Sequence, residues 1–136
     1  MASDQNVRLT HLGLPVTDLD KSVAFYEKWA GMKLRERVDD NGIRAARLSQ
    51  KSGTFTLSLL EMPMMRMPMP SMMHLGLNCD SKQQVDKIAA DANKAGILVA
   101  APIDSGPQLG YQTYISDPDG NNVEFAFGQK VGLLEE

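Results

Sequence analysis

The sequence predicts an α+β fold made of two βαβββ units in tandem. The tetrad His-Leu-Gly-Leu occurs twice, at residues 11–14 and 74–77, and the two copies contain both histidines of the chain. A few residues after each tetrad an aspartate, Asp18 or Asp80, stands at the start of a helix-like stretch. Three further strand-like segments follow in each half. Such self-similarity indicates two copies of one structural unit.

The first unit begins with a strand and a helix. Alternating apolar residues predict a strand over residues 8–16 that places His11 and Gly13 on the face opposite its leucines. Asp18 suits the N-cap of a helix over residues 19–30. The rest of the unit, up to about residue 62, is expected to contain a helix-ending glycine at Gly31, strands at 33–38, 43–48 and 54–60, and turns at 39–42 and 51–53.

The second unit, about residues 72–128, repeats that order. A strand over residues 73–79 carries His74, and a helix over residues 81–95 has an apolar stripe at helical spacing. An Asp-Pro-Asp-Gly turn at residues 117–120 joins the last two strands. The remaining features are a helix end at Gly96, strands at 97–100, 111–116 and 122–127, and a glycine- and proline-bearing loop at 102–110.

A methionine-rich linker over residues 62–73 joins the units. It holds seven of the nine methionines, and its prolines exclude a helix. Methionine adapts to irregular apolar surfaces. The linker therefore packs against a sheet or a second subunit, or it forms an apolar lip over a substrate pocket. Copper binding by thioethers is a third interpretation, but nothing else in the sequence fits copper.

The composition excludes several classes of protein. The 136 residues suffice for one compact domain, expected to span residues 1–136, and a net charge of −3 without a dense basic patch argues against a nucleic-acid partner. No apolar run approaches the length of a membrane span, and the N-terminus has no apolar signal core. The single cysteine, Cys79, excludes an internal disulfide and fits a cytoplasmic protein. A buried structural thiol is the expected role of Cys79.

The two histidines suggest a metal site. His11 and His74 occupy equivalent strands, and on the last strand Glu124 alternates with the bulky Val123 and Phe125, so its carboxylate should point away from the helix layer. A strand histidine or glutamate alone usually packs or is solvated. A buried carboxylate, however, needs a partner, and two histidines with one carboxylate form a facial set that leaves coordination positions open.

These motifs resemble the vicinal oxygen chelate superfamily, which includes glyoxalase I, methylmalonyl-CoA epimerase, extradiol dioxygenases and bleomycin-resistance proteins. The segments that carry the resemblance span almost the whole chain and are residues 11–18, 22–26, Gly31, residues 74–77 and residues 117–124. The resemblance implies paired βαβββ modules whose curved mixed sheets enclose a central cavity, and a homodimer. It also implies that one divalent metal is held by His11, His74 and Glu124.

The chain departs from glyoxalase I at the fourth ligand of that family. The glutamate or glutamine ligand on the last strand of the first module is replaced by Ser58, a poor ligand for these metals. Glu61 is out of phase by one residue and reaches the metal only if the strand end bulges. Glyoxalase-like chemistry also needs a carboxylate base, which makes Glu61 and Glu124 the candidates.

Further candidates flank this set. Tyr114 precedes the Asp-Pro-Asp-Gly turn at a spacing that resembles extradiol dioxygenases, and it either binds substrate or packs. The catalytic histidine of those enzymes would fall near residues 105–107, where none occurs. Arg47 is an anion-binding candidate among the arginines that flank the first hairpin. Ser58 and Gln112 complete the candidate substrate-binding residues.

The predicted function is a metal-dependent enzyme that acts on a small substrate with neighbouring oxygens. A glyoxalase-like lyase or isomerase is favoured and a dioxygenase is second. The competing class is a metal-free protein that sequesters a ligand, as bleomycin-resistance proteins do. The ligand set accepts Fe(II), Mn(II), Zn(II), Ni(II) and Co(II) alike. A small molecule is the expected partner, without nucleic acid or membrane.

Overall fold

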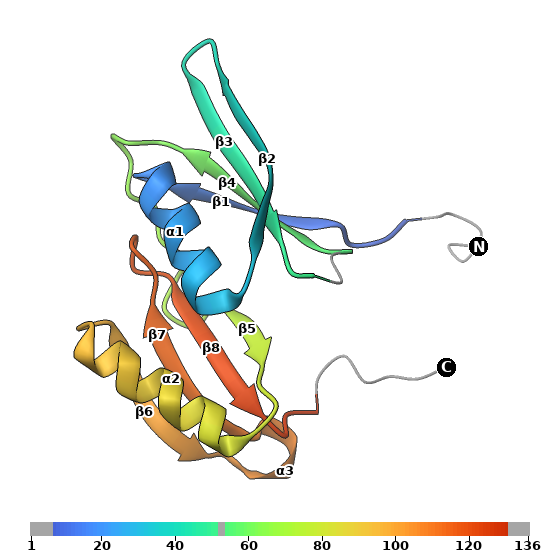
Figure 1. Cartoon of the computed structure of the whole chain (residues 1–136), viewed down its shortest axis with the longest axis vertical. Coiled ribbons are helices and arrows are strands. Elements are labelled where there is room, and N and C mark those ends of the chain that lie inside the picture. The colour runs from blue at the N-terminus through green and yellow to red at the C-terminus, as the bar shows by residue number, and fades with distance from the viewer. Residues whose placement is uncertain (1–6, 52–53, 131–136) are drawn as a thin grey trace. The chain divides into compact units, whose positions relative to one another are not determined.

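The computed structural model describes residues 7–51 and 54–130 and divides into two compact units, Met1–Met67 and Pro68–Glu136 (Figure 1). The division falls inside the predicted linker. Each unit is a four-stranded sheet with one long helix on it, and the strands and long helix follow the order βαβββ. The predicted α+β fold with two tandem βαβββ modules is therefore confirmed.

In the first unit the outer strand β1 pairs with the last strand. The elements are β1 (His11–Val16), α1 (Leu19–Ala30), β2 (Lys33–Asp40), β3 (Ile43–Ser49) and β4 (Thr56–Glu61), and the sheet order is β1-β4-β3-β2. β1 and β4 are parallel, whereas the other pairs are antiparallel, so the sheet is mixed. The apolar side chains of alternate positions, such as Leu14, Leu57 and Leu59, are buried with Leu19 and Tyr26 of α1. Helix α1 therefore covers one face, and the opposite face carries His11 and Gly13.

The ends of α1 follow the prediction. The side chain of Asp18 accepts a hydrogen bond from the Lys21 N–H, and Gly31 adopts a left-handed conformation with φ of 60°. The hairpin between β2 and β3 is tighter than the expected four-residue turn. Asn41 and Gly42 alone have positive φ there, 52° and 77°, because Asn-Gly fits a two-residue turn. The predicted turn at 51–53 lies partly outside the described residues.

The second unit repeats this topology. Its elements are β5 (His74–Asn78), α2 (Lys82–Lys94), β6 (Leu98–Asp104), α3 (Gly106–Leu109), β7 (Tyr111–Ser116) and β8 (Asn122–Phe127), and the sheet order is β5-β8-β7-β6. The expectation that Asp80 opens the helix is wrong by one residue. Ser81 is the N-cap and accepts a hydrogen bond from the Gln84 N–H at 3.1 Å. The side chain of Gln84 in turn accepts the Asp80 N–H, which satisfies a further donor before the helix.

The predicted loop at 102–110 is partly wrong. Strand β6 continues through Pro102 to Asp104, and a single helical turn, α3, follows. Proline is tolerated because β6 is the edge strand and its pairing with β7 is interrupted between Ala100 and Ile103.

A buried hydrogen-bond network closes the turn before β8. Asp117 accepts the backbone N–H groups of Asp119 and Asn121, and the Asn121 amide donates to the second oxygen of Asp117. The side-chain oxygen Oδ1 of Asn121 accepts the N–H of Met69 at 2.7 Å. The turn therefore holds the C-terminal part of the methionine linker against the second unit.

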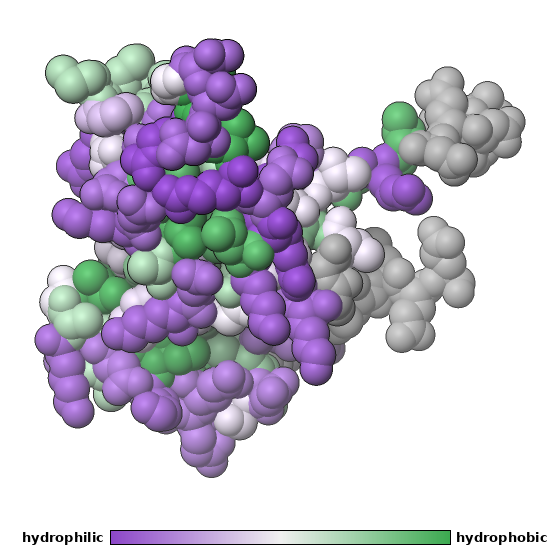
Figure 2. Space-filling model, turned by 45° about the horizontal axis from the view of Figure 1, so that its top comes forward, coloured by the Kyte–Doolittle hydropathy of each residue, from purple (hydrophilic) through white to green (hydrophobic). Residues whose placement is uncertain are grey.

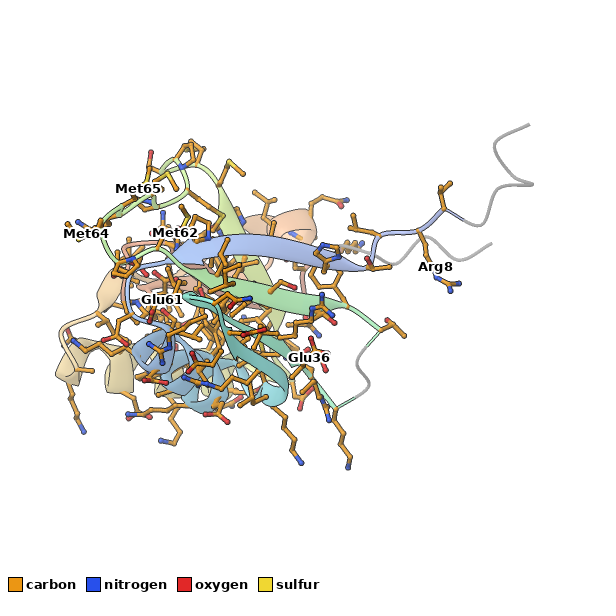
Figure 3. The ribbon with its side chains drawn as sticks, turned by 90° about the horizontal axis from the view of Figure 1, so that it is seen from above. Arg8, Glu36, Glu61, Met62, Met64 and Met65 are labelled. Atoms are coloured by element: carbon orange, nitrogen blue, oxygen red, sulfur yellow. The ribbon has the colours of Figure 1, made fainter. Side chains whose placement is uncertain are left out.

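The N-terminal part of the linker turns directly after β4. The Met65 N–H donates to the Met62 carbonyl at 3.1 Å, and Figure 3 shows Met62, Met64 and Met65 on the chain that leaves β4 at Glu61.

Polar side chains cover most of the face seen in Figure 2, with smaller apolar patches between them. Within residues 7–51 and 54–130, no helix has the length and apolar character needed to span a membrane.

Replacing Asn121 should destabilise the second unit. Asn121→Ala leaves the buried Asp117 carboxylate and the Met69 N–H without this partner, and unsatisfied buried groups cost about 1–3 kcal/mol each. We expect the free energy of unfolding in urea to fall by about 2 kcal/mol or more. Asn122→Ala, which removes only an exposed bond to Ser71, is the matched control. Equal stability of the two variants would contradict this role of Asn121.

Candidate functional site

The open face of the second unit brings three polar side chains together. Helix α2 covers one face of the sheet, and the other carries His74, Glu124 and Tyr114. In the strand register Gly76, Glu124 and Tyr114 lie side by side across β5, β8 and β7. A Cβ on Gly76 would come within 3.3 Å of Glu124 Oε1. The glycine of the tetrad therefore leaves the space that the carboxylate occupies.

Glu124 is a buried carboxylate with neutral hydrogen-bond donors. Its exposed fraction is 3%. The Tyr114 hydroxyl donates to Oε2 at 2.8 Å, and the Gln129 amide donates to Oε1 and Oε2 at 3.3 and 3.4 Å. Gln129 was not predicted. It follows β8 after Gly128, whose φ of 78° turns the chain back, and sequence spacing contains no signal for that contact.

His74 lies beside the same carboxylate. Its Nε2 is 3.8 Å from Glu124 Oε1, and its ring meets that of Tyr114 edge to face at a centroid distance of 5.3 Å. The other ring nitrogen, Nδ1, is 3.3 Å from the Met72 carbonyl oxygen. In the tautomer that donates this bond, Nε2 carries the lone pair, as a metal-binding imidazole requires.

The Tyr114 phenol remains protonated at neutral pH. Burial raises the pKa of Tyr114 to about 12, and the hydrogen bond to the Glu124 carboxylate and its negative charge add to this shift. The hydroxyl is therefore a permanent donor to Glu124 and fixes the orientation of that side chain.

On the open face of the first unit, different side chains occupy the equivalent register positions. Gly13, Ser58 and Arg47 lie side by side across β1, β4 and β3, so Ser58 stands where Glu124 stands in the other unit. Ser58 therefore lies on the open face of β4, opposite Gly13. Arg47 is the counterpart of Tyr114. Its guanidinium is 3.5 Å from Glu36 and its side chain is 61% exposed.

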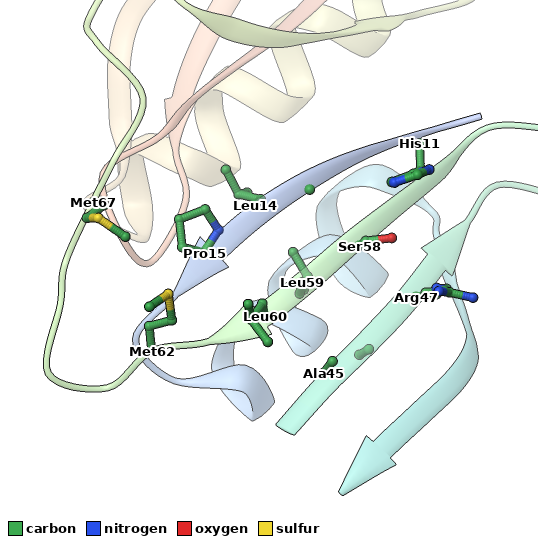
Figure 4. Close-up of a pocket in the computed structure, with 12 residues that line it drawn as sticks. His11, Leu14, Pro15, Ala45, Arg47, Ser58, Leu59, Leu60, Met62 and Met67 are labelled. Carbon is green, nitrogen blue, oxygen red and sulfur yellow. The ribbon is translucent and has the colours of Figure 1, made fainter. Parts of the chain in front are cut away.

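A cavity of about 460 Å³ lies on this face. Figure 4 shows His11, Ser58 and Arg47 on three neighbouring strands, with Leu60, Met62 and Met67 further along. The volume is in the range of small-molecule sites. Met62 and Met67 come from the linker, so its N-terminal part forms a wall of this cavity, as the interpretation of an apolar lip expects.

Glu61 points to the opposite side of its sheet. Its carboxylate accepts the Leu19 N–H at 2.8 Å and binds Arg44 Nη1 at 2.9 and 3.0 Å. Arg44 also pairs with Asp20, and hydrogen bonds from Arg37 and Arg44 lower the pKa of that carboxyl. Glu61 thus links the end of β4 to the start of α1 and to this ionic cluster.

The candidate residues divide between the units. The structure brings His74, Glu124 and Tyr114 together in the second unit, and His11, Ser58 and Arg47 along one cavity in the first. Neither unit, in its described residues, holds a group of three or more histidine, cysteine or acidic side chains arranged around a metal. Gln112 lies on the open face of β7, and among the described residues its buried Oε1 accepts no hydrogen bond.

A family model for the glyoxalase, bleomycin-resistance protein and dioxygenase superfamily matches residues 8–125. The match covers both units and all of the sequence motifs described above. The chain belongs to this superfamily. The resemblance inferred from the repeated tetrad is therefore confirmed at the level of the superfamily, which contains enzymes and binding proteins.

Two curated relatives of this superfamily member come from well-known bacteria. An uncharacterized protein of Pseudomonas aeruginosa is 35% identical over 127 residues, 91% of each chain. A probable trivalent organoarsenical cleaving enzyme of Bacillus subtilis is 30% identical over 124 residues, 89% of this chain and 80% of that protein.

Solved structures agree with the fold. A possible glyoxalase from Bacillus cereus has a TM-score of 0.73 at 27% identity and covers 88% of this chain and 97% of its own. An antibiotic-binding protein from a Streptomyces species has a TM-score of 0.68 at 26% identity, covering 90% and 97%. The fold is therefore shared by proteins of more than one function.

In this superfamily member, Glu61 should contribute to the stability of the first unit. Glu61→Gln removes the charge that holds Arg44 and weakens the bond to the Leu19 N–H. We expect the thermal unfolding midpoint to fall on the order of 5 °C. The exposed Glu27→Gln is the control. A midpoint equal to that of Glu27→Gln would contradict this structural role of Glu61.

Cys79 should be a poor nucleophile. The thiol is buried, and burial, followed by the nearby Asp80 charge, raises its pKa. Any stability from the neutral thiol is present below the unfolded-state pKa and is lost as the pH rises through the folded-state pKa. At pH 8 we expect Ellman's reagent to react roughly 100-fold more slowly with the folded protein than in guanidinium chloride. Equal rates would show an accessible thiolate.

Proposed function

We propose that this protein is a divalent-metal-dependent enzyme that acts on a small substrate with neighbouring oxygens, with His11, His74 and Glu124 as the metal ligands. A lyase or isomerase reaction is favoured over oxygenation. The observation that carries the proposal is the buried Glu124 carboxylate with the His74 imidazole 3.8 Å away on an open sheet face.

The donor set of the second unit fits a divalent metal. A buried carboxylate is costly unless it is paired, and the donors to Glu124 from Tyr114 and Gln129 are both neutral. A cation bound between Glu124 and His74 would supply the missing positive charge. The third ligand, His11, belongs to the other unit, and its assignment rests on the repeated tetrad.

The remaining residues have separate roles in this proposal. A bound metal would act as a Lewis acid that stabilises negative charge on the substrate oxygens. Tyr114 donates a hydrogen bond to Glu124 and keeps its carboxylate in one orientation. Glu124 is also the candidate proton acceptor, in preference to Glu61, because the Glu61 carboxylate is paired with the Arg44 guanidinium whereas the donors to Glu124 are neutral. Arg47 and Ser58 bind the substrate, and Gln112 is a further candidate.

The relatives do not fix the substrate. The Bacillus subtilis relative bears the name of a probable enzyme that cleaves trivalent organoarsenicals. Trivalent arsenic is a soft centre that prefers several thiolates, and this chain has one cysteine, Cys79, which is buried. We therefore favour an oxygen-ligating substrate. The metal remains one of Fe, Mn, Zn, Ni or Co. A cytoplasmic homodimer remains a prediction.

The second candidate function is ligand sequestration without a metal. The similarity to an antibiotic-binding protein and the cavity of the first unit favour it. A sequestering protein has no need of the carboxylate and imidazole pair, so metal binding separates the two functions.

Metal binding should depend on the predicted ligands. Metal-stripped protein titrated with Mn(II), Co(II), Ni(II) and Zn(II) by calorimetry should bind about one ion per chain. His11→Ala, His74→Ala and Glu124→Gln should each weaken binding by more than about 100-fold, because loss of an outer-shell partner alone costs about 10–100-fold. Tyr114→Phe should fall within that smaller range.

Two controls complete the experiment. Glu27→Gln carries the same charge change as Glu124→Gln at an exposed site of α1 and should bind metal normally. Circular dichroism checks that every variant is folded. If the wild-type protein binds none of these four metals or Fe(II), or binds each of them no more tightly than Glu124→Gln does, the metal-dependent proposal is wrong and sequestration becomes the better assignment.

A further inference from the structure

The cavity on the first unit has a polar end and an apolar end. The polar end is made by His11, Ser58 and Arg47. The apolar end is lined by Pro15, Ala45, Leu60, Met62 and Met67. Figure 4 shows the polar group at one end of the strands, and the apolar group toward the other end and on the linker segment that follows β4. The surface is therefore amphipathic along the strand direction.

The rise per residue of strand β4 gives the distance between the polar and apolar ends of the cavity. Ser58 and Leu60 are neighbours on the open face of β4, and Met62 follows at the end of that strand. At about 3.3 Å per residue, Ser58 and Met62 are roughly 13 Å apart along the strand. Leu60 is 44% exposed, so its side chain is available to contact a bound molecule. The cavity therefore accommodates an elongated ligand rather than a small ion.

The charge at the polar end selects an anion. Arg47 is the one cation among the residues that line this cavity, and its guanidinium can bind a planar carboxylate through two parallel hydrogen bonds. Its present partner is Glu36 on β2, at 3.5 Å and with a half-exposed side chain. A surface pair of this kind is weak. A ligand carboxylate that also contacts Ser58 and the apolar wall can displace Glu36.

We propose that this cavity binds an amphipathic organic acid, with its carboxylate at Arg47 and Ser58 and an acyl or aryl tail along Leu60 and Met62. The inference rests on the proposed function only in taking this molecule as the substrate. Glu36 acts as an internal competitor for Arg47, so the pair sets the affinity for the acid. The methionines of the linker, which adapt to irregular shapes, form the tail wall.

The test uses straight-chain carboxylates from butanoate to decanoate and the matching primary alcohols. Each is titrated into metal-stripped, ¹⁵N-labelled protein and followed by amide chemical shifts. We expect shifts at Ser58 and Leu60, and an affinity gain of about two- to four-fold per added methylene until the tail fills the cavity. The alcohols should bind about 3- to 10-fold more weakly than the acids.

Four variants separate the head from the tail. Arg47→Gln should lower the affinity for the acids to that for the alcohols, with the same affinity gain per methylene. Glu36→Gln should raise the affinity for the acids about 2- to 5-fold. Leu60→Ser should flatten the chain-length dependence. Arg8→Gln, the matched charge control, removes an exposed arginine outside the cavity lining and should change nothing.

The outcomes distinguish this inference from the metal proposal. Acid binding that persists in metal-stripped protein and in Glu124→Gln supports the cavity assignment, whatever the metal titrations show. The inference is overturned if acids and alcohols bind equally, if Arg47→Gln behaves as Arg8→Gln does, or if decanoate causes no shifts at Ser58 and Leu60.

Discussion

The parallel pairing of the first and last strands determines what each open face carries. In both units the glycine of the His-Leu-Gly-Leu tetrad lies opposite one residue of the last strand, Ser58 for Gly13 and Glu124 for Gly76. A one-residue shift of this register would turn that residue toward the helix. In the second unit the absent Cβ of Gly76 also leaves room for the Glu124 carboxylate. Register and glycine together make a buried, directed carboxylate possible.

The two units share one fold but carry different side chains at equivalent positions of their open faces. At equivalent register one unit presents a serine and an arginine, and the other a glutamate and a tyrosine. The Ser58 and Arg47 pair provides a neutral donor and a cation, which suits an anionic or oxygen-rich ligand. The Glu124 and Tyr114 pair, with His74, provides a carboxylate of fixed orientation, which suits a cation. The duplicated fold thus presents side chains suited to an anion in one unit and to a cation in the other, rather than two copies of one site.

The sequence was informative wherever a local pattern decides the structure. Helix α1 spans Leu19–Ala30 between the caps Asp18 and Gly31 as expected, because capping and the left-handed glycine are local effects. The face of Glu124 followed from simple alternation. Contacts that form where the chain turns back on itself could not be predicted from local sequence patterns. The hydrogen bonds of Gln129 to Glu124 and of Met69 to Asn121 are two examples. The loop predicted from Pro102 onward was wrong in part because an edge strand tolerates proline, and the local sequence does not show which strand lies at the edge of the sheet.

Strand phase also explains why two glutamates on equivalent last strands have different fates. Glu124 shares the phase of Gly76 and faces the open side, where its hydrogen-bond donors among the described residues are the neutral Tyr114 and Gln129. Glu61 has the phase of Leu57 and Leu59 and faces α1, where Arg44 neutralises it and the Leu19 N–H binds it. A carboxylate already paired with arginine gains little from a metal or a substrate proton. The buried Glu124 carboxylate has no arginine partner among the described residues, so the phase of a single residue decides which of the two carboxylates is paired with an arginine.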